Sequence, residues 1–315
     1  MGFTAFQGMK PFPQLMFSAF VIIVSFLAFL LVSMLLAIPL FGLDSILSIP
    51  TIRDLNNPES IRILKYFQVV QSIGLFIVPP VILAWLFHGK IAEYLYLKRN
   101  ASSTSIFLVA ILVVFALPLI NFIGEWNTRM KFPEFLAGLE RWMKNAEENA
   151  AELTEAFLTV ETTSGLLFNL FMIAVLPAIG EELLFRGVIQ RIFTNWTRSH
   201  HWGIWISAIL FSALHIQFYG FVPRMLLGVL FGYLLVWSGS MWLPIVAHFF
   251  NNGFAVVAMY LIDKNVLNPG VEEIGATSNS YYAAFLSLAL VFLLMFLIKK
   301  ENKGNELQPA EISSE

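Results

Sequence analysis

The chain has 315 residues, of which 58% are hydrophobic and 13% are charged, and its mean hydropathy is +0.74. Soluble domains carry about 25% charged residues, so this composition excludes a soluble globular enzyme, and 31 Phe exclude a disordered chain. The formal net charge of -2 provides no basic excess for binding nucleic acid. Because the chain contains no cysteine, disulfides, thiolate nucleophiles and Cys-ligated metals are excluded as well.

Long apolar runs bounded by polar residues recur along the chain. A membrane-spanning helix needs about 20 mostly apolar residues, and this rule predicts an all-α, polytopic membrane protein with a bundle of about eight transmembrane helices. The fifth run is short and could be tilted or re-entrant. In chain order, the runs are Met16 to Phe41, Tyr66 to Phe87, Ser105 to Ile123, Leu166 to Gln190, Trp202 to Gln217, Val222 to Trp237, Trp242 to Ile262 and Tyr281 to Ile298.

The main hydrophilic stretch, Glu125 to Glu161, places apolar residues three and four positions apart. This spacing predicts one amphipathic helix that lies in the membrane interface or over the bundle, with a lid or partner surface as the alternative. The expected organisation is therefore three spans and the amphipathic helix in residues 1–164, a catalytic core in 165–262, and a last span with a polar tail in 263–315.

An even number of spans places both termini on one side of the membrane. Pairs of cations lie where the chain leaves predicted spans, at Lys98-Arg99 and at Lys299-Lys300. Such cations favour the cytosolic side of a membrane. The first run follows Lys10 without a cleavage pattern, which predicts a retained signal anchor. We therefore expect a multi-pass protein of the bacterial plasma membrane with cytosolic N and C termini.

The fourth run contains two acids and a base, Glu181, Glu182 and Arg186. Charges inside a membrane span are costly, so their positions point to function. Glu182 and Arg186 are four residues apart and can pair on one helix face, whereas Glu181 points about 100° away. A buried ion pair that joins helices would explain Glu182 and Arg186, but Glu181 would still need a metal, a proton or a water.

The fifth and seventh runs add His215, and His248 with Asn252 on one helical face. A lone histidine in a membrane is more often a packing residue than a ligand. Two histidines, a carboxylate and an amide on three helices can instead converge on one point, as the ligands of a catalytic zinc ion. Glu181 could ligate the metal or take the proton from the attacking water, and the residues leave both roles open.

Three short sequences, EELLFRG at 181–187, FSALH at 211–215 and HFFNN at 248–252, carry a family resemblance. They resemble the EExxxR, FxxxH and HxxxN motifs of the CPBP intramembrane proteases, which include the type II CAAX prenyl endopeptidases and bacterial Abi-type relatives. The resemblance covers about residues 165 to 255. It implies an all-helical membrane endopeptidase that hydrolyses a peptide bond with an activated water.

The resemblance also implies roles for the site residues. Glu181 would be the water-activating base and His215 its partner or a metal ligand. His248 and Asn252 would be metal ligands or oxyanion stabilisers, and Arg186 would hold Glu182 in place. Zinc, bound by Glu181, His215, His248 and Asn252, is the expected cofactor, with a metal-free mechanism as the alternative.

The expected function is hydrolysis of a membrane-associated or lipid-modified peptide or protein, with the bilayer and this substrate as partners and no nucleic acid. One alternative is a proton-coupled transporter in which Glu181, Glu182 and the two histidines form a proton relay. Another is a non-catalytic member of the same family that acts as a scaffold or a bacteriocin-immunity protein.

Other polar and small residues have simpler explanations. Arg224 follows Pro223 and is expected to extend to the outer head groups. Gly228 and Gly232 form a Gly-x-x-x-Gly pattern that predicts close helix packing. Pro177 should kink or loosen the helix just before Glu181.

The end of the fourth run sets the expected depth of the site. If this helix ends near Gln190, Glu181 lies about nine residues, or roughly 14 Å, below the cytosolic surface at 1.5 Å per residue.

Overall fold

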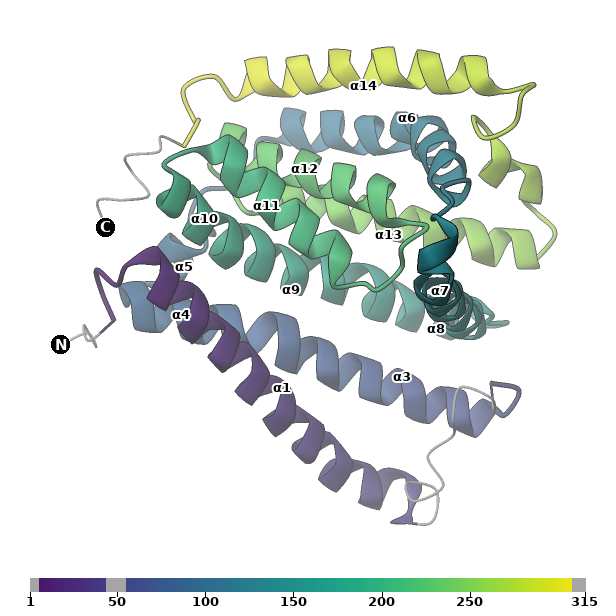
Figure 1. Cartoon of the computed structure of the whole chain (residues 1–315), viewed down its shortest axis with the longest axis horizontal. Helices are drawn as coiled ribbons and strands as arrows, with labels where there is room; N and C mark the ends of the chain where they lie inside the picture. Colours follow the sequence, from purple (N-terminus) through teal and green to yellow (C-terminus); the bar gives the residue numbers. More distant parts are fainter. Residues whose placement is uncertain (1–5, 44–54, 308–315) are drawn as a thin grey trace.

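A computed structural model describes residues 6–43 and 55–307, and within these ranges every regular element is a helix (Figure 1). The prediction of an all-α, polytopic membrane protein is confirmed. The α-helices are α1 (Pro11–Phe41), α3 (Pro58–Ser72), α4 (Val78–His88), α5 (Ile91–Tyr94), α6 (Ser103–Thr128), α7 (Ala137–Leu158), α8 (Thr163–Asn169), α9 (Leu176–Leu184), α10 (Gln190–Thr197), α11 (His200–Ala213), α12 (Phe221–Ser238), α13 (Trp242–Asp263) and α14 (Tyr281–Glu301). Short π-helical and 3-10 turns join them: η2 (Ile73–Ile77), η3 (Glu134–Leu136), η4 (Leu170–Val175), η5 (Phe185–Ile189) and η6 (Pro269–Glu273).

Seven helices in the described residues are long and apolar enough to cross a membrane, one fewer than predicted. The difference is the fifth run, where α11 has only 14 residues. At 1.5 Å per residue it is about 21 Å long, shorter than a hydrocarbon core of about 30 Å. It ends at Ala213, so His215 lies in the loop that follows rather than inside a helix.

The first and last described residues lie at one end of the bundle, which we call the terminal face (Figure 1). Gln7 donates to the carbonyl of His88 at 3.3 Å, and the backbone N–H of Leu307 donates to the carbonyl of Val236 at 2.9 Å. The turn between α10 and α11 lies at the same end (Figure 1). α11 therefore runs away from the terminal face, and α12 runs back to it, so that the two helices form a hairpin.

The helix that carries the two acids extends beyond Gln190, so the predicted end of this helix is wrong. α8, η4, α9, η5 and α10 form one continuous segment that ends at Thr197. Its polar residues near 190 are buried rather than interfacial: Arg191 donates to the carbonyl of Tyr94 at 2.9 Å and lies over the Tyr94 ring. Glu181 lies sixteen residues before Thr197, about 24 Å along the helix.

The hydrophilic stretch forms the predicted amphipathic helix, α7, which runs across the long helices and is seen nearly end-on in Figure 1. Hydrogen bonds from two sides hold it. The amine of Lys65 on α3 donates to the carbonyl of Phe157 at 2.8 Å, and the backbone N–H of Tyr219 donates to Glu147 at 3.2 Å. α7 therefore lies against the loop between α11 and α12, away from the terminal face.

The Gly-x-x-x-Gly pattern of α12 brings its backbone close to α11, as predicted. A Cβ atom at Gly228 would lie 3.1 Å from the Cβ of Ala208, and one at Gly232 would lie 2.8 Å from the Cγ2 of Ile204. The carbonyl oxygens of both glycines accept buried hydrogen bonds from the helix that carries the acids.

Candidate active site

The two acids lie on α9, a nine-residue α-helix between the π-helical turns η4 and η5. π-helical turns are rare and occur frequently at functional sites. Pro177 at the start of α9 has no N–H to donate, which loosens the helix as predicted. A Cβ atom at Gly180 would lie only 2.8 Å from the Cβ of Phe76, so this glycine allows η2 to pack directly beside Glu181.

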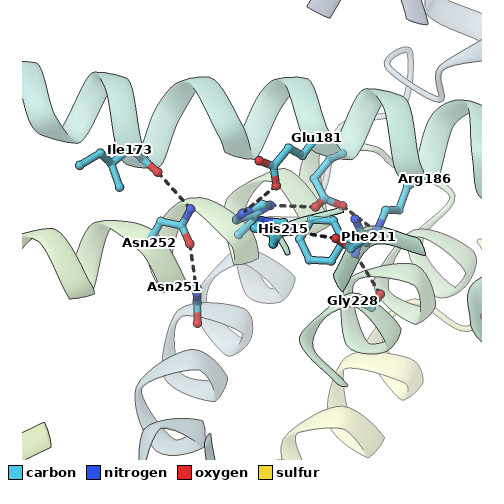
Figure 2. Close-up of polar contacts among 10 residues, drawn as sticks. Ile173, Glu181, Arg186, Phe211, His215, Gly228, Asn251 and Asn252 are labelled. Carbon is cyan, nitrogen blue, oxygen red and sulfur yellow. Dashed lines mark hydrogen bonds and ion pairs between the residues drawn. The ribbon is translucent and has the colours of Figure 1, made fainter. Parts of the chain in front are cut away.

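Glu182 is completely buried and belongs to a network that joins three helices. One of its carboxylate oxygens lies 3.0 Å from Nε of Arg186, which is the predicted pair, and the other lies 2.8 Å from Nδ1 of His248 on α13 (Figure 2). Arg186 in turn donates to the carbonyl of Gly228 on α12 at 3.0 Å. The network fixes the position and the orientation of the His248 ring.

Two phenylalanine rings enclose this network. The guanidinium carbon of Arg186 lies 4.8 Å from the ring centroid of Phe211 and 5.4 Å from that of Phe231. The His248 ring stacks on Phe231 at a centroid distance of 5.2 Å. Phe211 belongs to the predicted motif, but Phe231 was missed, because nothing in a sequence with 31 Phe distinguishes it.

Glu181 is buried but is not engaged by a close partner. Its Oε2 atom has no hydrogen-bond partner among the described residues and lies 3.9 Å from Nε2 of His248 (Figure 2). That distance is longer than a hydrogen bond. Since Nδ1 of His248 faces Glu182, Nε2 is the nitrogen that faces Glu181. The pair therefore presents a carboxylate oxygen and an imidazole nitrogen to the same small space.

His215 approaches this pair from the loop after α11. Its Nδ1 lies 2.8 Å from the carbonyl oxygen of Phe211, which leaves Nε2 available. The Phe211 ring lies beside both histidines, with centroid distances of 5.0 Å to His215 and 6.1 Å to His248. Among the described contacts, no direct hydrogen bond joins His215 to Glu181 or His248.

Asn252 makes different contacts from those its motif suggests. Its amide nitrogen donates to the carbonyl of Ile173 in η4 at 3.0 Å, and its oxygen accepts from Asn251 at 3.1 Å (Figure 2). It thereby ties α13 to the π-helical turn that precedes α9. The structure does not bring it into hydrogen-bond contact with the other predicted site residues.

The donor atoms suit zinc, although they are not gathered as a metal centre. Glu181, His215 and His248 offer a carboxylate and two Nε2 atoms, and a carboxylate on the second nitrogen, as Glu182 is to His248, is typical of a metal-bound histidine. In the part of the chain that the structure describes, no three His, Cys, Asp or Glu side chains are grouped so that they could hold a metal ion. Zinc therefore stays a prediction that rests on donor chemistry.

Arg224 was predicted to reach the outer head groups, but it turns toward the loop after α11 instead. Its two terminal nitrogens lie 3.3 Å from the carbonyl oxygen and 2.5 Å from the side-chain oxygen of Gln217. The carboxylates whose charges act on it are Glu147 and Glu181. Its neighbour Pro223 suggested a helix end at the interface, whereas the structure bonds Arg224 to the loop that carries His215.

Comparison with known protein families finds a match for the segment that carries the site residues. Residues 163–254 match the model of the type II CAAX prenyl endopeptidase Rce1-like family. This segment is Rce1-like. It contains all three motifs, so the resemblance drawn from them is confirmed, and the chain is an integral membrane protein with a segment similar to a family of peptidases.

A curated relative matches part of the same chain. It is the uncharacterized protein YpbD of Bacillus subtilis (strain 168), which is 31% identical over 85 residues, or 26% of this chain and 40% of its own length. No solved structure matches the chain significantly. Because the chain covers 40% of that relative's length, the activity, substrate and partners of the whole protein are matters for proposal.

Proposed function

We propose that the chain is an intramembrane endopeptidase, similar to the CAAX proteases, in which Glu181 activates the hydrolytic water. One observation carries this proposal: Glu181 is buried without a close partner and faces Nε2 of a histidine that Glu182 and Arg186 hold rigidly. A buried carboxylate without a partner is expensive in a purely structural role. A role in holding and deprotonating water accounts for a carboxylate that is buried at this cost in free energy.

The residues suffice for a balanced hydrolysis. Glu181 accepts one proton from water as the hydroxide oxygen bonds to the scissile carbonyl carbon. In the metal-free mechanism, His248 keeps its Nδ1 contact with Glu182 and donates through Nε2 to the oxyanion that forms. The C–N bond then breaks, and the proton on Glu181 passes to the leaving amine.

The first experiment compares Glu181→Gln with wild type in proteoliposomes, using a lipid-modified peptide with a fluorophore and a quencher. Loss of the base should lower the cleavage rate by roughly 10²- to 10⁴-fold. Glu152→Gln, on the exposed side of α7, keeps the wild-type rate as the matched control. Equal rates in both variants would reject the proposal, whereas proton flux without cleavage would establish the transporter, and a phenotype independent of Glu181 would establish the scaffold.

We also propose that zinc binds at this site, where Glu181, His215 and His248 would hold it. When bound, zinc would polarise the carbonyl and lower the pKa of water. Mass spectrometry of the detergent-purified protein should find near-stoichiometric zinc that both His215→Ala and His248→Ala lose. A folded, monodisperse wild type without zinc would contradict this and leave the metal-free mechanism.

The proposed substrate is a membrane-associated or lipid-modified peptide or protein, and the proposed location is the bacterial plasma membrane with both termini in the cytosol. The chain has no cysteine, so single cysteines can be labelled without a background. A membrane-impermeant maleimide applied to intact cells should label Glu152→Cys on α7 and spare Ser199→Cys at the terminal face. The reverse pattern would invert the orientation.

A further inference from the structure

The loop between α11 and α12, residues 214–220, carries His215 on irregular backbone. Ile216, which follows His215 directly, has a φ of +56°. This left-handed conformation is strained for a β-branched residue, and such strain persists only where the surrounding structure imposes it. The Nδ1 atom of His215 contacts the carbonyl oxygen of Phe211 in the same hairpin. The position of the His215 ring therefore depends on what holds the loop.

Asn127, near the end of α6, holds this loop from one side. Its side chain is buried, and its amide nitrogen donates to the carbonyl of Phe218 at 3.0 Å. Its amide oxygen accepts from the backbone N–H of Val222 at 2.8 Å. Val222 lies in the first turn of α12, where N–H groups have no partner within the helix. Both polar atoms of one side chain therefore bind the main chain of the hairpin.

α7 holds the loop from a second side. The carboxylate of Glu147 accepts the backbone N–H of Tyr219 at 3.2 Å, and the Trp142 ring lies 5.4 Å from the Phe218 ring, centroid to centroid. Apolar packing here is incomplete, because Phe218 and Tyr219 line a cavity of about 260 Å³ together with residues of α6, α7 and α12. The hydrogen bonds of Asn127 and Glu147 therefore contribute much of what fixes the loop.

We propose that Asn127 and Glu147 are positioning residues for His215. They act through the loop, and they set where His215 lies relative to Glu181 and His248. Both lie outside residues 163–254, the segment that matches the family model. The inference rests on the proposed endopeptidase function, and it gives α6 and α7 a part in the site although neither carries a motif.

The first test measures cleavage of the lipid-modified fluorogenic peptide in proteoliposomes. Asn127→Ala should lower kcat by roughly tenfold to hundredfold, because a small displacement of a catalytic group is costly in rate. KM should stay close to that of wild type, since the loss falls on the transition state. Asn121→Ala is the matched control, on the same helix with its amide bonded to the carbonyl of Ile274 at 3.1 Å, and it keeps the wild-type kcat.

A second pair of variants tests the contact from α7, where a substitution leaves the membrane spans intact. Glu147→Ala removes one hydrogen bond and should lower kcat less than Asn127→Ala does. Glu147→Gln keeps an oxygen that can accept from Tyr219 and should restore most of kcat. Glu148→Ala, at the exposed next position, keeps the wild-type rate. Equal losses in the Ala and Gln variants would assign the effect to the charge of Glu147 and reject its role as an anchor.

A nitroxide on the loop reports its mobility without any substrate. The chain has no cysteine, so Leu214→Cys, exposed beside His215, can carry a single label, and Ile209→Cys on α11 can carry a reference label. Adding Asn127→Ala should narrow the electron paramagnetic resonance lines at 214 and leave those at 209 unchanged. Unchanged lines at 214, or equal narrowing at both positions, would overturn the inference.

The two measurements separate this inference from the proposed function. A more mobile loop with an unchanged kcat would overturn the positioning role and leave the endopeptidase function standing. A wild type that cleaves no peptide would reject the function instead. The nitroxide spectra would then decide alone whether α6 holds the loop.

Discussion

Two helical segments of this protein are buried to very different extents. From 180 to 192, in α9, η5 and α10, every residue is buried, including two acids and two arginines. α1 has 31 residues, and its buried positions are Ser18, Ser25, Ser33 and Ala37, while most of its large apolar side chains are exposed. Figure 1 shows α1 diverging from the bundle toward its far end, whereas α9 lies among other helices.

The difference follows from lipid as a solvent. Lipid tails solvate leucine as well as a protein interior does, so association between helices depends on close packing and hydrogen bonds. Ser25 on α1 accordingly donates to the carbonyl of Gly74 at 2.6 Å. In such a protein small and polar residues indicate the interior, and a buried charge indicates a site.

The largest expected effect comes from breaking the buried network. Glu182→Gln leaves Arg186 buried without its counter-charge, which should cost about 3–5 kcal/mol of stability. Leu31→Ala on α1, where the side chain is 64% exposed, is the contrasting change and should stay within about 0.5 kcal/mol. Unfolding of both variants in the same detergent, followed by circular dichroism, measures the difference. Similar losses in the two would remove the distinction between the segments.

A smaller effect is expected from adding one methyl group where α9 meets η2. Gly180→Ala places its Cβ 2.8 Å from that of Phe76, and such overpacking costs about 1–3 kcal/mol. Gly124→Ala, on α6 with no atom within 4 Å of the new Cβ, is the matched control. It should be neutral or stabilising by up to about 1 kcal/mol, since alanine favours the helix. Equal stability of the two variants would show that η2 can shift to accommodate the added methyl group.

The local parts of the site could be predicted from the sequence, and the contacts between helices could not. Spacing of four residues identified the Glu182–Arg186 pair, which the structure contains at 3.0 Å. The contact of 2.8 Å between Glu182 and His248 joins α9 to α13 across 66 positions, and no periodicity encodes it. Asn252 shares a helix face with His248, yet its amide bonds to η4 instead.

Two errors of the sequence reading have the same physical origin. Polar residues near the end of an apolar run normally lie at the membrane interface, so Gln190 was taken as a helix end and Arg224 as a residue that extends to head groups. Tyr94 buries Arg191 next to Gln190, and Gln217 holds Arg224. Both partners come from distant or irregular segments that the apolar pattern does not place.

The smallest expected effect lies outside both segments, at Glu93 on the short helix α5. Hydrogen bonds from Lys98 and Lys90 lower the pKa of this partly exposed carboxyl group. A lowered pKa in the folded state contributes stability above the ordinary pKa of glutamate, and this is lost as the pH falls through the folded value. Glu93→Gln should therefore melt slightly below wild type at neutral pH, and the two curves should converge in acid. Glu152→Gln, the control, should match wild type at neutral pH, and a Glu93→Gln difference that persists below the carboxyl range would contradict the charge argument.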